Sequence, residues 1–295
     1  MPLSTSDRLQ YLLWAGTRAC IAPDKKCPGC GSPRTAIVRR KYLVTSLWEC
    51  AVCALRFRVP KDRLDSSEDF YQEAYSEGFT TDCPSPETLA SLISTSFAGT
   101  EKDFSAYLSA LGSVGLKPGD AILDFGSSWG YGSWQLSRAG FRVFSYEISQ
   151  PRSEYARTKL GCRMVRSPDD LEDRVKCLFS SHVIEHLPNP ALLWEIAGKV
   201  LTDDGLIVCF CPNGEPAREA IVSVGRYDQL WGKVHPLLIT PEFLRNMSTR
   251  HGWSAQVYSA SFASNTIAAG RLIEGQLTGD ELCMVARRAI AQHDP

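Results

Sequence analysis

Short apolar runs and longer amphipathic stretches alternate through the middle of the chain. Five runs are short, apolar and bounded by turn residues, as buried strands are; they are Ala121–Phe125, Phe141–Glu147, Cys162–Val165, Val175–Ser181 and Leu206–Cys211. Helical stretches separate most of them, over Gly130–Ala139, Pro151–Leu160 and Pro190–Leu201. This alternation predicts an α/β fold with a Rossmann-like, doubly wound and mostly parallel sheet.

The pattern changes toward the C-terminus. A helix is predicted over Pro241–His251, and two β-like runs follow it, Trp253–Ala260 and Leu282–Arg287. No helical pattern lies between these runs, so we expect an antiparallel pair that gives the sheet an antiparallel C-terminal edge strand. Residues 61–118 are expected to be mostly helical. The predicted organisation is a module at residues 1–63, a helical region at 64–118 and a Rossmann-like domain at 119–295.

Two Cys-x-x-Cys pairs stand out in the N-terminal module. They are separated by 19 residues, and they are Cys27 with Cys30 and Cys50 with Cys53. This spacing is typical of a structural zinc site in which four thiolates complete the coordination of one ion. The β-like runs Thr35–Arg40 and Tyr42–Trp48 predict a hairpin that brings the second pair back to the first. We therefore predict a zinc-ribbon-like module that gains folding energy from its metal.

Composition is ordinary for a globular protein, but charge is unevenly distributed. Hydrophobic residues make up 44% of the chain and charged residues 22%. No apolar run reaches 18 residues, which excludes a membrane-spanning helix, and the scattered remaining cysteines fit a reducing, cytoplasmic location. Residues 1–63 hold 12 Lys and Arg against 4 Asp and Glu, while the remainder holds 20 against 29. Either the basic module meets an anionic partner, or its charges form a solvated face.

A glycine-rich segment follows the first predicted strand and opens the next helix. Its glycine and polar positions include Asp124, Gly126, Ser127, Gly130 and Gly132. Glycines here let the backbone approach a ligand, and the helix N-terminus offers N–H groups to a carboxylate or phosphate. The spacing differs from the Gly-x-Gly-x-x-Gly of dinucleotide-binding sheets. Glu147 ends the next predicted strand, 21 residues after Gly126, where a carboxylate can accept both hydroxyls of a ribose.

Together these residues resemble the class I S-adenosylmethionine-dependent methyltransferases. Three further segments carry the resemblance, Ser180–Leu187, Asp203–Leu206 and Cys211–Asn213. The run Ser-His-Val-Ile-Glu-His-Leu-Pro-Asn-Pro at residues 181–190 is similar to the small-molecule and sugar-directed branch of that family. The resemblance implies an enzyme that transfers a methyl group from S-adenosylmethionine to a small acceptor.

The resemblance also implies roles for particular residues in holding the cofactor. Gly126 and its neighbours would hold the methionine part and Glu147 the ribose. Asp169 or Asp170 would meet the adenine edge, although an ordinary helix start also uses such residues. Ser181 and His182 would line the methionine end.

A histidine beyond the fourth predicted strand is the candidate base. Hydroxyl and carbon acceptors must lose a proton during methyl transfer, and a neutral imidazole suits that task near pH 7. His186 follows Glu185 at this position, with His182 close by. Glu185 would orient the ring or steer a cation. The alternative is a structural histidine, because Pro188-Asn189-Pro190 also predicts a helix start.

Two further segments have two interpretations each. Residues 213–240 form a long insertion containing Tyr227, Trp231 and His235. Long connections at the functional edge of a sheet are often lids, and the alternative is one surface helix. Upstream aromatic residues either cover the cofactor or belong to a core; they are Phe70, Tyr71, Tyr75 and Phe79.

The acceptor class remains open between two main interpretations. The chain is similar to certain sugar C-methyltransferases that join a four-cysteine zinc module to this domain and use the histidine of a Glu-His pair. Those enzymes act on anionic nucleotide-linked keto sugars, and they carry a further C-terminal domain that these 295 residues lack. The rival is an RNA-modifying enzyme whose zinc module grips phosphates; the candidate contacts are Arg34, Arg39, Arg40, Lys41, Arg56 and Arg58. A non-catalytic cofactor-binding scaffold is the third interpretation.

Overall fold

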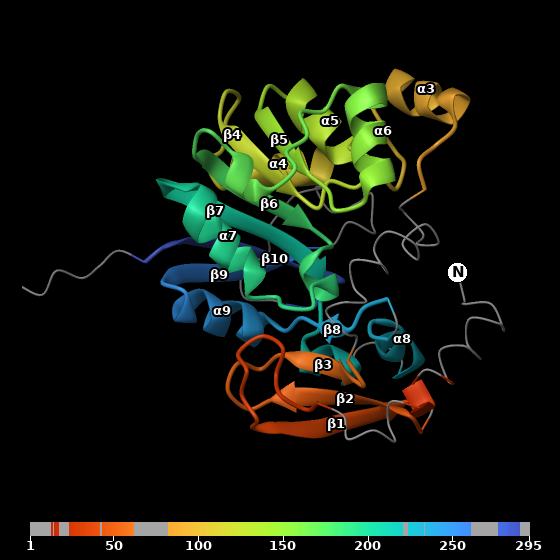
Figure 1. Ribbon diagram of the computed structural model, residues 1–295, viewed down its shortest axis with the longest axis vertical. Coiled ribbons are helices and arrows are strands. Elements are labelled where there is room, and N and C mark those ends of the chain that lie inside the picture. The colour runs from red at the N-terminus through yellow and green to blue at the C-terminus, as the bar shows by residue number, and fades with distance from the viewer. Residues whose placement is uncertain are drawn as a thin grey trace, which may run out of the picture.

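The computed structural model contains two sheets that are joined through a shared core (Figure 1). It describes residues 13, 15–17, 24–41, 43–61, 82–220, 224–232, 234–260 and 277–289. The aromatic residues predicted to cover the cofactor, at positions 70–79, lie outside these ranges.

The larger sheet confirms the predicted Rossmann-like fold. Its six strands have the order β5-β4-β6-β7-β10-β9, with bounds β4 Ala121–Phe125, β5 Arg142–Tyr146, β6 Val175–Ser181, β7 Leu201–Pro212, β9 Trp253–Ala260 and β10 Glu281–Arg288. The first four strands in this order are parallel, and β10 runs antiparallel to both of its neighbours. The predicted antiparallel pair therefore lies at the edge, with the last strand inserted between β7 and β9. The run at Cys162–Val165 contributes a single parallel bridge to β5, from Met164 to Ser145.

Helices pack on both faces of this sheet. Their bounds are α3 Pro86–Ser94, α4 Ser105–Ser113, α5 Tyr131–Arg138, α6 Gln150–Leu160, α7 Leu192–Val200, α8 Val224–Gln229 and α9 Pro241–Arg250. Apolar residues of α4 and α5 pack with Ile122 and Phe179 on one face. Those of α7 and α9 pack with Leu123 and Leu178 on the other. Side chains that alternate along β4 and β6 thus supply two cores, as expected for a sheet buried on both faces.

Short 3-10 helices complete the main domain at its loops. They are η2 Pro168–Asp170, η3 Ile184–His186 and η4 Pro216–Ala220. Among the described residues, no helix is both long and apolar enough to cross a membrane.

The smaller sheet is antiparallel and belongs to the cysteine module. Its order is β1-β2-β3-β8, with bounds β1 Thr35–Lys41, β2 Thr45–Cys50, β3 Arg56–Val59 and β8 Leu237–Leu238. The predicted hairpin is confirmed as β1 and β2. Strand β8 comes from the insertion at residues 213–240 and pairs Leu237 with Phe57. The insertion therefore adds a strand to the module, which neither sequence interpretation included.

The module shares its apolar core with the larger domain. Leu55 and Phe57 are fully buried in the same cluster as Phe243 and Trp194. Gly29 lies so close to α9 that a Cβ atom there would stand 3.0 Å from the ring of Phe243. A side chain at Gly29 would thus require Phe243 or Leu55 to shift slightly at this contact.

Candidate active site and cysteine cluster

The glycine turn after β4 is built from backbone contacts that leave little room for side chains. Gly126 has φ of 85°, and a Cβ there would lie 2.3 Å from a methyl group of Val183. The amides of Gly126 and Ser127 both donate to the carbonyl of Tyr146, at 2.9 and 3.0 Å. The turn is thereby fixed against the end of β5 and the loop after β6, at the carboxyl edge where open α/β sheets bind ligands.

Two other glycines of the motif are required by packing. A Cβ on Gly130 would stand 2.7 Å from that of Ala156, and one on Gly132 would stand 2.4 Å from the ring of Phe104. Gly130 also has φ of 89°, a conformation that other residues rarely adopt. These glycines let α5 lie close to its neighbours and set the direction of the turn.

Glu147 lies beside the glycine turn, as predicted. Its Oε2 accepts from the amide of Ser128 at 2.9 Å, and its Oε1 accepts from the amide of Ser149 at 2.8 Å. Burial raises the pKa of Glu147, while these amides favour its charged form. Each oxygen retains acceptor capacity. The carboxylate is thus oriented and able to accept two hydroxyl groups.

Asp124 supports the turn from beneath. Its side chain is only 4% exposed and accepts from the Ser133 hydroxyl at 2.5 Å, which in turn accepts from the Ser145 hydroxyl at 2.8 Å. Burial raises the pKa of Asp124 to about 7. Asp124 therefore connects β4, α5 and β5, and its surroundings are those of a residue that positions the loop.

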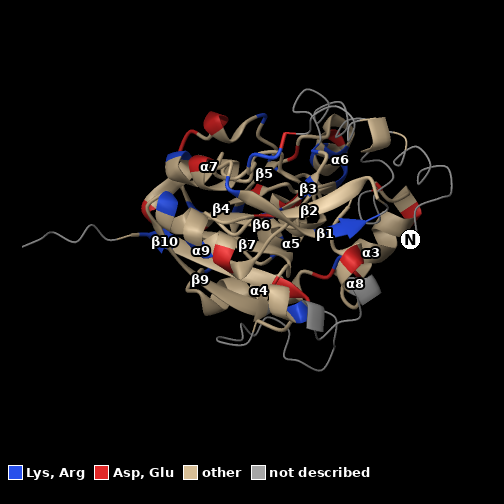
Figure 2. Cartoon of the chain, turned by 90° about the horizontal axis from the view of Figure 1, so that it is seen from below, with Lys and Arg blue, Asp and Glu red and all other residues tan. Residues whose placement is uncertain are grey.

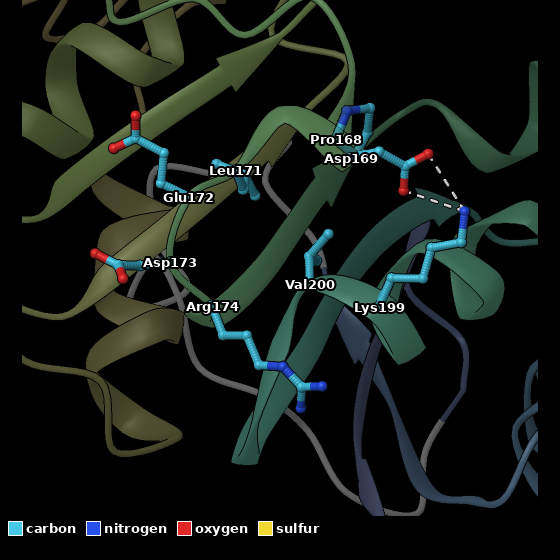
Figure 3. Close-up of a pocket in the computed structure, with 8 residues that line it drawn as sticks. All are labelled: Pro168, Asp169, Leu171, Glu172, Asp173, Arg174, Lys199 and Val200. Atoms are coloured by element: carbon cyan, nitrogen blue, oxygen red, sulfur yellow. Dashed lines mark hydrogen bonds and ion pairs between the residues drawn. The ribbon is translucent and has the colours of Figure 1, made fainter.

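Asp169 and Asp170 lie away from Glu147. Figure 3 shows Asp169 in a hollow with Lys199, to which it is ion-paired at 3.1 Å. The hollow is also lined by Arg174 and Val200, the residues just before β6 and β7, and so it lies at the amino ends of these strands. Asp170 accepts from the amide of Ser167 and caps η2. The structure does not bring this pair to the glycine turn, and its adenine role stays a prediction.

His182 bridges two carboxylates after β6. Its Nδ1 lies 3.3 Å from Oε1 of Glu185, and its Nε2 contacts Glu281. Burial alone would lower the pKa of His182, but both carboxylates outweigh it and raise the pKa to about 10. His182 also has φ of 56°, an uncommon conformation for a residue other than glycine. Next to it, the Ser181 side chain hydrogen-bonds Tyr107 of α4.

Glu185 and His186 lie together in η3. Glu185 is 1% exposed, and its Oε1 stands 3.9 Å from Nε2 of His186. Burial would raise the pKa of Glu185, but the neighbouring histidines, His182 first, lower it to about 2. Burial also lowers the pKa of His186, to about 4, so its ring is neutral near pH 7. His186 Nδ1 lies 2.7 Å from the carbonyl oxygen of Val234, which can only accept. The proton is therefore on Nδ1, and Nε2 carries the lone pair.

Two residues of this site were not predicted from the sequence. Glu281 is the first residue of β10, and it reaches the carboxyl edge because β10 runs antiparallel to β7. The sequence feature that could have indicated Glu281 is its position as an acidic residue directly before the predicted strand Leu282–Arg287. His235, from the insertion, places its ring 4.8 Å from that of His186, edge to face. No local pattern indicates that contact, because it depends on β8 joining the module.

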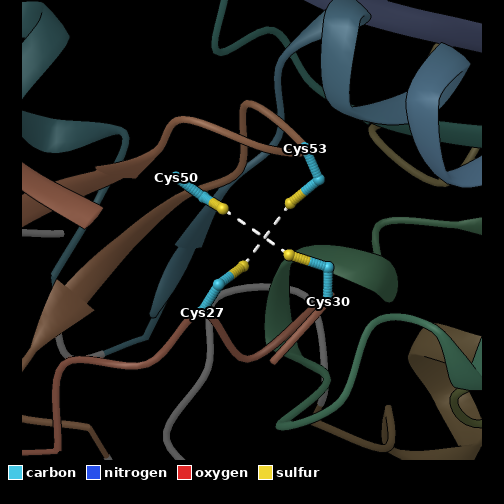
Figure 4. Close-up of side chains that lie close together, drawn as sticks. All are labelled: Cys27, Cys30, Cys50 and Cys53. Carbon is cyan, nitrogen blue, oxygen red and sulfur yellow. Dashed lines mark hydrogen bonds between the residues drawn. The ribbon is translucent and has the colours of Figure 1, made fainter. Parts of the chain in front are cut away.

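The four predicted cysteines converge at one point (Figure 4). Cys27 and Cys53 sulfurs lie 3.4 Å apart, and those of Cys30 and Cys50 lie 3.5 Å apart. Sulfurs around a tetrahedral zinc ion are about 3.8 Å apart, close to these values. The cysteines are free thiols, and the amide of Val52 points at the Cys50 sulfur at 3.4 Å. The donor set fits a structural zinc ion, which would hold the two turns of the module together.

The sheet order and the glycine turn define a Rossmann-like α/β domain with its ligand edge at Gly126 and Glu147. Residues 123–209 of this domain match the sequence profile of the family described as a methyltransferase domain. The chain thus carries a class I S-adenosylmethionine-dependent methyltransferase domain. No curated protein sequence matches the chain.

The solved structures to which the chain is similar are distant in sequence. A chain from the complex of the Haloferax volcanii Trm112 methyltransferase activator with a methyltransferase is 17% identical, with a TM-score of 0.49, over 70% of this chain and 99% of that one. Magnesium protoporphyrin IX methyltransferase of Synechocystis is 12% identical, with a TM-score of 0.49, over 77% and 100%. The CcbJ methyltransferase of Streptomyces caelestis is 15% identical, with a TM-score of 0.48, over 65% and 98%.

Proposed function

We propose that this enzyme methylates a small-molecule acceptor, a sugar in nucleotide-linked or glycan form, and that His186 accepts the proton released. The observation that carries the proposal is the hydrogen bond from His186 Nδ1 to the carbonyl of Val234. It fixes the tautomer in which Nε2 carries the lone pair, at the carboxyl edge of the sheet, beside Glu185. Methyl transfer to oxygen or carbon requires a base of this kind.

The residues at the glycine turn fit S-adenosylmethionine. Glu147 is oriented to accept the ribose hydroxyls, and Gly126, Ser127 and Ser181 lie along the same edge. The cofactor supplies an electrophilic methyl group on a sulfonium. His182 carries one positive charge between the two carboxylates of Glu281 and Glu185, so the net charge of the three side chains is negative. This negative charge favours a bound cation.

Four of the six candidate phosphate contacts are engaged or buried within the molecule, and the other two, Arg34 and Arg40, are exposed. Arg39 is ion-paired with Asp228 at 2.6 Å, and Lys41 donates to the carbonyl of Asp228 at 2.8 Å. Arg56 contacts Glu49 and the hydroxyl of Tyr227; Arg58 is 1% exposed. In Figure 2, the Lys and Arg positions among the described residues are spread over several elements. This arrangement favours a small acceptor over a nucleic acid.

A labelled-methyl assay tests the proposal. The purified enzyme is incubated with labelled S-adenosylmethionine and pools of nucleotide sugars, glycans or RNA, and we expect label in a sugar pool. His186→Asn keeps an N–H donor for Val234 and removes Nε2, so kcat should fall at least about 100-fold. Affinity for S-adenosylmethionine, measured by calorimetry, should stay within about twofold.

The matched control is His251→Asn. His251 stacks on Trp194 at the end of α9, outside the candidate site, and this variant should keep full turnover. Wild-type turnover in His186→Asn would remove His186 as the proton acceptor. If only the RNA pool became labelled, the proposed sugar acceptor would be wrong and RNA would be the acceptor class.

A further inference from the structure

Glu185, His186 and His235 form a cluster with the composition of a metal site. One ligand atom from each lies within 4.8 Å of the other two. They come from the loop after β6 and from the insertion before β8, which are 49 residues apart in the chain. The cluster is separate from the four cysteines, and neither the family match nor the cysteine motif accounts for it.

The buried carboxylate of Glu185 lacks the hydrogen bonds that its burial requires. Among the described residues, neither of its oxygens has a hydrogen-bond partner, although His182 lies within ion-pair distance of one of them. His182 compensates part of the charge of Glu185, while the carboxylate oxygens keep acceptor capacity for a further cation. A cation bound at its oxygens would satisfy it, and the nearest other donor atom is Nε2 of His186 at 3.9 Å.

Both histidines have the orientation of metal ligands. His186 gives its Nδ1 proton to the carbonyl of Val234, and the ring of His235 is hydrogen-bonded to the backbone of Leu230. A ligating histidine usually donates its second ring nitrogen to a carbonyl or carboxylate in this manner, which directs the other lone pair at the ion. Ligand atoms around a tetrahedral ion are about 3.4 Å apart. The atoms of Glu185 and His186 are 3.9 Å apart and the three ligand atoms lie within 4.8 Å of one another, so an ion would draw them together by roughly 0.5 to 1.4 Å.

We propose that Glu185, His186 and His235 bind a divalent transition-metal ion such as zinc. Two imidazoles and one carboxylate leave a fourth coordination position open, as in catalytic zinc sites. An acceptor oxygen bound at that position would lose its proton more readily, and with Nε2 of His186 on the ion the proton would pass to solvent water. This inference rests on the methyl transfer of the proposed function and changes one part of it. In the metal-loaded enzyme Nε2 of His186 would ligate the ion, and so it would not also accept the proton of the acceptor.

The cysteine module positions the third ligand. His235 stands two residues before β8, which pairs with β3. The amide of Arg58 donates to the carbonyl of Pro236 at 2.8 Å, and Thr240 donates to the carbonyl of Ala54 at 2.9 Å. The zinc-ribbon fold therefore holds His235 in place for the second ion.

Metal counting tests the inference. The full-length protein is equilibrated with micromolar zinc, freed of excess ion and analysed for zinc per chain by mass spectrometry. We expect two ions in the wild type and in the matched control His251→Ala, and one ion in His235→Ala and in Glu185→Gln. Cobalt titration should show thiolate charge-transfer bands in all four proteins, and a weaker nitrogen–oxygen spectrum only in the first two.

The zinc count either supports the second metal site or overturns it. Loss of one ligand should weaken zinc binding at the second site at least about 100-fold. One ion in the wild type, or two ions in a folded His235→Ala variant, would overturn the inference. Either result would leave methyl transfer and the role of His186 as proton acceptor intact, because the methyl assay tests those separately. Glu185→Gln keeps the shape of the site and so gives a second test if His235→Ala is unstable.

Discussion

Glu147 joins two loops of the site through a single side chain. Its oxygens accept amides from Ser128 in the glycine turn and from Ser149 at the start of α6. Hydrogen bonds of this type orient the carboxylate in advance, so a ligand that uses it loses little additional freedom. Glu147, which in the sequence resembles an ordinary charged residue at the end of a strand, is thus a structural part of the glycine turn.

Replacing Glu147 by glutamine should weaken cofactor binding. Glu147→Gln removes the charge and one acceptor, and a hydrogen bond to a charged group is worth about 1.5–3 kcal/mol, so the Kd for S-adenosylmethionine should rise about 10- to 100-fold. Calorimetry measures it. The control is Glu154→Gln on the exposed surface of α6, where Glu154 pairs only with Arg157 among the described residues. An unchanged Kd in Glu147→Gln would exclude this carboxylate from the cofactor site.

Asp124 gives the folded protein a pH dependence of known sign. Its pKa is about 7 when folded and about 3.9 when unfolded, so the folded state binds more protons between these values. Below pH 4 this bound proton contributes its full stabilisation to the folded state. As the pH rises to 7, the free energy of unfolding falls by about 4 kcal/mol because that contribution is lost. Asp124→Asn imitates the protonated form and removes this loss. Urea unfolding from pH 5 to 8 should show the variant gaining stability relative to the wild type.

The exposed Asp203→Asn variant serves as the control for that experiment. It should follow the wild type across the whole pH range. A constant difference between Asp124→Asn and the wild type would show that Asp124 is ionised in the folded protein throughout.

Regular elements were predictable where local pattern and burial agree. Strands β4 to β7 are buried on both faces, so continuous apolar runs identified them, and helices α5 to α7 followed between them. Strand β8 has two residues and no period of its own. It exists because β3 offers an unpaired edge, and only the folded module creates that edge.

The candidate site was predictable to the same extent. Gly126, Glu147, Glu185 and His186 each lie just after a predicted strand, and their spacing together with the family resemblance placed them at the carboxyl edge. Glu281 and His235 reach the site through non-local pairing, β10 beside β7 and β8 beside β3. Pairing of this kind is decided by the topology of the whole sheet and leaves little trace in nearby residues.

At the scale of the molecule, part of the positive charge on the described residues of the module is used for internal contacts. Arg39 and Lys41 stack over Tyr227 and Trp231 of the insertion, at 5.7 and 5.2 Å. Contacts between cations and aromatic rings of this kind hold two segments together when they are partly shielded from water. Charge counted along the sequence therefore overstated what the module offers to a partner.

Loss of the cysteine site should destabilise the whole protein. Cys53→Ser removes one of four thiolates from a cluster that shares its core with the main domain. We expect the Tm to fall by roughly 6 °C, equivalent to about 3–4 kcal/mol for a chain of this size. Calorimetric unfolding and zinc content measure the effect, with the exposed Cys83→Ser as control. An unchanged Tm with one zinc fewer would show that the ion contributes no stability.

Strand β8 has a consequence for any shortened form of this protein. The strand lies 180 residues after β3 in the chain, yet the two complete one sheet. An enzyme trimmed of its first 63 residues would leave β8 with no neighbour to pair with, and would release the loop that carries Val234 and His235. The N-terminal module therefore cannot be replaced as an independent domain, since one strand of its sheet, β8, belongs to the sequence of the catalytic domain.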